Sequence, residues 1–100
     1  MSDVNDVAAA IIAEFQRQYP GESITTLKLQ KLVYYSQAWH LVWDEEPLFS
    51  ERIEAWANGP VVRELYRVHR GDFKVSKWSE GRISNLTKSQ KETIDAVLKG

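Results

Sequence analysis

The chain has 100 residues, a formal net charge of −1 and 43% hydrophobic residues, values that fit one small globular domain. It contains no cysteine, which excludes thiol catalysis, zinc–thiolate sites and disulfides. The small net charge gives no general attraction to nucleic acid or anionic lipid. With no basic leader and no apolar run of membrane-spanning length, we expect a cytoplasmic protein without a membrane partner.

Two helices are predicted in the first half of the chain. Apolar residues recur every three or four positions over Asp3–Tyr19, which indicates an amphipathic helix with Ser2 or Asp3 as its cap. A second helix is predicted over Leu27–Trp43 after a threonine cap. Its apolar residues lie on all sides of the helix, which is typical of a helix that is central to a core or that shares a face with a partner.

We interpret the Leu27–Trp43 helix as the centre of the fold. Its aromatic side chains are large enough to organise a core of this size. Tyr35 and Trp39 are therefore expected to be packing residues, whereas Trp43, Trp56, Tyr66 and Trp78 fit either a core or an interface.

The second half of the chain predicts shorter elements. A strand is expected over Ile53–Trp56, followed by a break and a helix over Pro60–Arg70 that begins at the proline. Phe73–Val75 and Arg82–Ile83 are candidates for a minor sheet with the first strand. A last helix over Thr87–Lys99 opens with a capping-box pattern. These elements predict a mainly α, single compact domain, with a central hydrophobic helix surrounded by about three helices and a minor β element.

No catalytic, cofactor or metal site is predicted. Ser36, His40 and Asp44 share one helix face, but a serine in mid-helix tends to bond to the preceding turn, and no oxyanion hole is apparent. His40 and His69 lack the spacing of a metal motif, and each is expected to be satisfied by a nearby polar group. We therefore expect a protein that is not an enzyme.

A basic stripe stands out instead. Arg63, Arg67 and Arg70 follow i, i+4, i+7 spacing on one predicted helix. This stripe fits a solvated helix face, a patch that docks on an acidic protein surface, or a nucleic-acid contact that uses the basic region Arg63–Arg82. We predict a partner-binding face composed of Trp56, Asn58, Arg63, Tyr66, Arg67 and Arg70.

Several blocks in order resemble a known family. The blocks are LKLQKL from Leu27, YY from Tyr34, WHL from Trp39, EPLF from Glu46, IEAW from Ile53, GPVV from Gly59 and LY from Leu65. Together they resemble the Panacea (SocA-like) antitoxin domain, which is also seen in phage-associated GepA-like proteins. The resemblance covers residues 3–70 well and the remainder loosely.

The resemblance implies a function. Family members are compact helical domains of bacterial and prophage toxin–antitoxin pairs that neutralise a toxin by direct contact, and some hand the toxin to a protease. We therefore expect a non-catalytic antitoxin over residues 1–100 with a cognate toxin as its partner. The alternatives are a small nucleic-acid-binding regulator and a small hydrolase that uses His40. Family members usually continue with further helical sequence, so we expect either a truncation at Gly100 or a short version of the domain. The oligomeric state and the identity of the toxin stay open.

Overall fold

The computed structural model describes residues 2–100, which form four α-helices and two pairs of short strands. In chain order they are α1 (Val4–Gln18), β1 (Ile24–Thr25), α2 (Thr26–Asp44), β2 (Ile53–Trp56), β3 (Gly59–Val62), α3 (Arg63–His69), β4 (Lys74–Val75), the 3-10 helix η1 (Ile83–Asn85) and α4 (Lys88–Lys99). The expected mainly α fold with a minor β component is confirmed.

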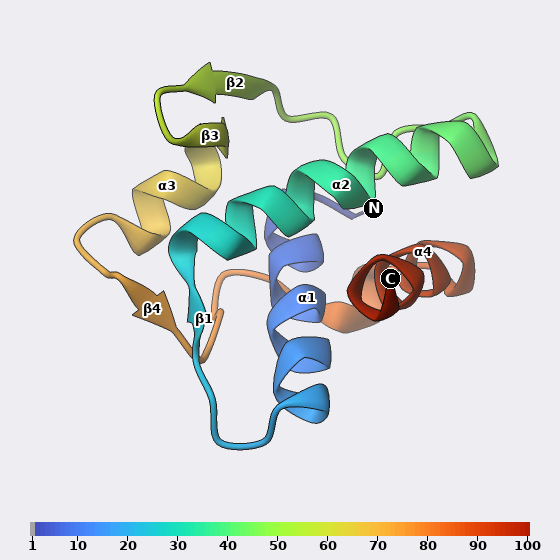
Figure 1. The fold of residues 1–100 in the computed structure, drawn as a ribbon. Coiled ribbons are helices and arrows are strands. Elements are labelled where there is room, and N and C mark those ends of the chain that lie inside the picture. The colour runs from blue at the N-terminus through green and yellow to red at the C-terminus, as the bar shows by residue number, and fades with distance from the viewer. Residues whose placement is uncertain (1) are drawn as a thin grey trace.

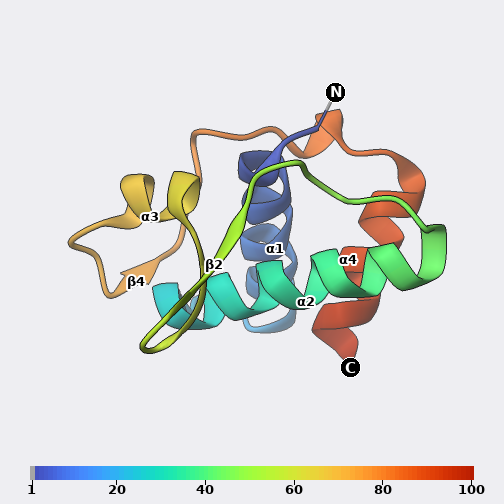
Figure 2. The same ribbon diagram turned by 90° about the horizontal axis from the view of Figure 1, so that it is seen from above.

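The helices cross rather than align (Figures 1 and 2). Helix α2 runs across α1, with the β2–β3 hairpin above its first half and α4 beside its second half (Figure 1). Helix α3 packs against α1 and β3. The core lies between these elements, and α1 supplies many of its fully buried side chains, including Val4, Val7 and Ile11.

Helices α1 and α4 begin directly after the capping residues that the sequence predicts. Asp3 caps α1 in a capping box with Asp6, and Thr87 caps α4 in a capping box with Gln90. In each box the two side chains satisfy backbone N–H groups that have no partner inside the helix. The predicted boundaries of these two helices are therefore confirmed to within a residue.

The exposure of α2 differs from the expectation. Its buried residues are Leu29, Gln30, Val33, Ser36 and His40. Tyr35 is 53% exposed and Trp39 is 46% exposed, so the prediction that these two are packing residues is wrong. Helix α2 joins α1, α4 and the hairpin through a partly polar side and turns its aromatic side outward.

The side chain of Gln30 explains how the hairpin attaches to α2. Gln30 is 2% exposed, and its Oε1 accepts a hydrogen bond from the Val62 N–H at 2.9 Å while its Nε2 donates to the Val62 carbonyl at 3.3 Å. Gln37, two turns later, accepts from the Leu48 N–H at 2.7 Å and donates to the Phe49 carbonyl at 2.8 Å. We call these two side chains the amide clamps.

The third helix begins later than predicted. The prediction of a helix that starts at Pro60 is wrong, because Gly59–Val62 folds back as β3 and pairs antiparallel with β2. Gly59 follows the two-residue turn with φ of +131°, a conformation that favours glycine. Pro60 lies opposite Ala55 in a two-stranded hairpin, where a missing N–H is tolerated on an edge strand. Helix α3 then begins only at Arg63.

The predicted strand at Arg82–Ile83 is also wrong, since Ile83 begins η1. Two groups of this segment bind α1 instead. The Arg82 N–H donates to Oδ1 of Asp6 at 2.8 Å, and the Trp78 indole donates to Asn5 Oδ1 at 3.0 Å. Lys74–Val75 does form a strand, but its partner is Ile24–Thr25 at the start of α2.

Replacing Gln30 tests the first amide clamp. Gln30→Ala leaves the buried N–H and C=O of Val62 without their partner, so we expect the free energy of unfolding to fall by about 3 kcal/mol. Gln16→Ala is the matched control, because Gln16 donates to a backbone carbonyl at an exposed position and should change stability by less than about 0.5 kcal/mol. Urea denaturation measures both, and equal small losses would show that the clamp contributes little.

Candidate functional site

Ser36, His40 and Asp44, which share one face of α2, make contacts within α2 and with α4. Ser36 Oγ donates to the Leu32 carbonyl at 2.7 Å, one turn earlier in α2. His40 Nδ1 lies 2.8 Å from Thr93 Oγ1, and its Nε2 lies 3.5 Å from a carboxylate oxygen of Asp44. This geometry ties α2 to α4 and directs the serine oxygen into its own helix, which is not the arrangement of a nucleophile with its base.

Five of the six predicted partner-binding residues gather on one surface. Trp56 from β2 lies beside α3, and a groove of about 420 Å³ is lined by Trp56, Arg63, Glu64, Tyr66, Arg67 and Arg70. We call this surface the basic–aromatic face. Asn58, the sixth predicted residue, is exposed in the turn between β2 and β3 and is not among the lining residues.

Glu54 organises one side of the basic–aromatic face. Its two carboxylate oxygens accept from the Trp56 indole at 2.9 Å and from Arg63 Nε at 2.8 Å. The hydrogen bond from Trp56, followed by that from Arg63, holds the pKa of Glu54 below its ordinary value. The Arg63 guanidinium also lies 5.9 Å from the Trp56 ring centroid, so the arginine and the indole are held as a pair.

Tyr66 connects Trp56 with the buried His69. Its ring meets Trp56 edge-on at 4.9 Å between centroids and His69 edge-on at 5.6 Å. His69 is buried, with Nε2 3.0 Å from the Gln30 amide nitrogen, and burial lowers its pKa. The basic–aromatic face is therefore connected through His69 to the first amide clamp.

Arg67 and Arg70 are the charges that this face leaves available. Both are exposed, and within residues 2–100 neither makes an ion pair, unlike Arg63. Guanidinium groups bind carboxylates through paired hydrogen bonds, and arginine and aromatic side chains are enriched in protein interfaces. The face can therefore bind an acidic surface.

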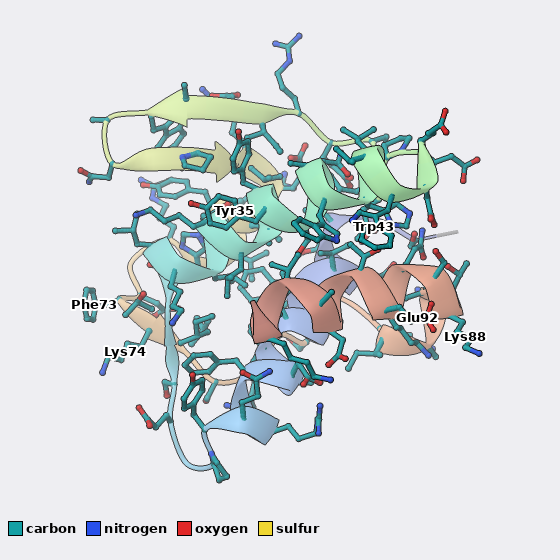
Figure 3. All side chains as sticks on the ribbon, turned by 45° about the vertical axis from the view of Figure 1, so that its right-hand side comes forward. Tyr35, Trp43, Phe73, Lys74, Lys88 and Glu92 are labelled. Carbon is teal, nitrogen blue, oxygen red and sulfur yellow. The ribbon has the colours of Figure 1, made fainter. Side chains whose placement is uncertain are left out.

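A second, apolar surface lies between α2 and α4. A groove of about 560 Å³ is lined by Tyr35, Ala38, Trp39, Val42, Trp43, Ala96, Val97 and Gly100. Val42 is 78% exposed and Trp43 is 68% exposed, and Figure 3 shows Tyr35 and Trp43 along α2 above α4. We call this surface the α2–α4 face. Sequence reasoning missed it as a site, although the apolar residues all round the helix were the signal.

Among residues 2–100, no group of three or more His, Asp or Glu side chains is placed to hold a metal ion. In the same part of the chain, no helix combines the length and apolarity needed to cross a bilayer.

Comparison with known proteins identifies a family for most of the chain. The family model described as antitoxin SocA-like, Panacea domain, matches residues 29–100. This range reaches Gly100 and leaves out residues 3–28, which differs from the expected good match over residues 3–70. No curated protein and no solved structure matches the chain.

The buried His69 predicts a pH dependence of stability. Because burial lowers its pKa in the folded state, the unfolded state binds more protons as the pH falls. The free energy of unfolding should have its full value above the ordinary histidine pKa of about 6.5, and it should decrease below that pH. We expect urea midpoints to fall between about pH 7.5 and about pH 5.5, and to fall less in His69→Gln. Identical slopes for both proteins would contradict this assignment.

Proposed function

The chain belongs to the family of SocA-like antitoxins with a Panacea domain, and from this membership we propose that it neutralises a cognate toxin by direct, non-catalytic binding. The toxin would be the product of a neighbouring gene in a bacterial or prophage toxin–antitoxin pair. One observation supports a binding site: the basic–aromatic face holds Trp56, Tyr66 and Arg63 together in a fixed arrangement.

The geometry of that face supports a protein partner. A standard interface covers about 800 Å² per partner and concentrates its binding energy in a few aromatic and arginine residues. Trp56 and Tyr66 are already ordered by their neighbours, so binding would cost little further side-chain entropy. Arg67 and Arg70 supply the charges for an acidic region of the toxin.

The nucleic-acid alternative would use the same arginines. Affinity for nucleic acid rises with the number of phosphates that a protein neutralises. Glu54 already pairs with Arg63, and Glu64 lines the same groove, so the net positive charge of this surface is small. We therefore favour an acidic protein surface. Binding to a DNA duplex with a steep salt dependence would instead favour the alternative.

Co-expression with the product of the adjacent gene tests the proposed function. We expect the wild-type chain to relieve toxin-induced growth arrest and to co-purify with the toxin. Arg67→Glu/Arg70→Glu reverses two exposed charges and should raise the dissociation constant by about tenfold or more. Lys77→Glu/Lys74→Glu is the matched control, because it makes the same charge change at exposed positions outside the groove.

Two results would contradict different parts of the proposal. Growth arrest that the wild-type chain does not relieve, with no complex on purification, would contradict neutralisation by direct binding. A normal complex with the double arginine variant would contradict only the assignment of the toxin to the basic–aromatic face.

A further inference from the structure

Along the outward side of α2, basic residues are followed by apolar residues and then by acidic residues. Lys28 and Lys31 lie in its first turns, the apolar residues of the α2–α4 face follow, and the exposed Glu45 and Glu46 come directly after the helix. At 100° per residue, Lys28, Lys31, Tyr35, Trp39 and Val42 fall on one side of the helix. These five residues are all exposed. The surface therefore runs from basic through apolar to acidic.

The apolar part of this surface is large for a chain of this size. The exposed fractions of Tyr35, Trp39, Val42 and Trp43 correspond to roughly 500 Å², on a scale of about 150–250 Å² for each aromatic side chain. This is near the upper end for the largest apolar patch on a monomer, about 300–600 Å², and is more than half of the roughly 800 Å² that each partner contributes to a standard interface. The charged ends of α2 supply further area.

We propose that the α2–α4 face binds a second copy of this chain, with the two α2 helices antiparallel about a two-fold axis near Trp39. In this arrangement Lys31 of one copy lies beside the acidic end of the partner's α2, and the same contact repeats on the other side of the axis. An isologous dimer requires a surface that is complementary to itself. The basic–apolar–acidic order meets this requirement in the antiparallel orientation, whereas a parallel pair would place like charges together.

The shape of the face fits the same arrangement. Val42 and Trp43 form its most exposed ridge, and the groove beside them is bounded by Ala38 on α2 and by Ala96 on α4. Rotation about an axis near Trp39 brings the ridge of one copy opposite Tyr35 and Ala38 of the other. Trp39 and Trp43 are stacked at 6.0 Å between centroids, so much of this surface is ordered before association.

This inference is independent of the proposed toxin contact, because the basic–aromatic face lies on β2 and α3 and shares no lining residue with the α2–α4 face. A dimer would therefore leave both copies of the basic–aromatic face available.

Sedimentation equilibrium of the purified chain at low salt is the first test. We expect a mass twice that of the 11.5 kDa chain, with dissociation on dilution. Val42→Asp places a charge at an exposed apolar position and should weaken the dimer by about tenfold or more. Phe73→Asp is the matched control: Phe73 is 73% exposed and lies at the far end of the molecule (Figure 3), so this variant should remain dimeric. Circular dichroism verifies that both variants fold.

A charge exchange tests the antiparallel orientation. Lys31→Glu and Glu46→Lys should each weaken the dimer by up to about tenfold, since each substitution acts at both symmetric contacts. Combining the two should restore most of the wild-type affinity. A wild-type chain that is monomeric throughout, a Val42→Asp variant that remains dimeric, or a double variant without recovery would overturn the proposal. No toxin is present in this experiment, so its result leaves the proposed function untouched.

Discussion

Two side-chain amides on α2, those of Gln30 and Gln37, hold the chain between Leu48 and Val62 in place. Each amide both accepts a hydrogen bond from a backbone N–H and donates one to a backbone carbonyl, which is the way one strand pairs with another. Gln30 thereby attaches α2 to the end of β3, and Gln37 attaches it to the segment that leads into β2. Because the hairpin contributes Trp56 and leads directly into α3, the position of the basic–aromatic face depends on these bonds.

The amide clamps also explain why α2 is oriented with its aromatic residues outward. A buried polar side chain is favourable only when its hydrogen bonds are made, and here the segments that pack on α2 supply partners for Gln30, Gln37 and His40. Since this side faces the core, Tyr35, Trp39 and Trp43 lie on the other side. The helix buries Gln30, Ser36 and His40 together with Leu29 and Val33, and it exposes most of its aromatic residues, unlike an ordinary surface helix.

Features determined by neighbouring residues could be predicted from the sequence. The caps of α1 and α4, strand β2 and the gathering of Arg63, Tyr66 and Arg67 depend on residues a few positions apart. The bond between Gln30 and Val62 spans 32 residues, and no local pattern indicates it. From the sequence alone, glutamine is expected to be solvated, and tyrosine and tryptophan are expected to lie in the core. The predicted exposure of α2 is wrong because this expectation does not include the long-range bond. The predicted start of α3 is wrong for a different reason: Gly59–Val62 pairs with Ile53–Trp56 across a two-residue turn, whereas Gly59 and Pro60 alone indicate a break before a helix.

The amide clamps recognise peptide groups, which are the same whatever side chain a residue carries. Gln30 needs a free N–H and a carbonyl at position 62, and Gln37 needs the corresponding groups at positions 48 and 49. The identities of side chains in the hairpin, such as that of the half-buried Trp56, are therefore not constrained by the amide hydrogen bonds that hold it. The side chains at these positions can therefore vary in evolution while the hydrogen bonds that hold the framework stay intact.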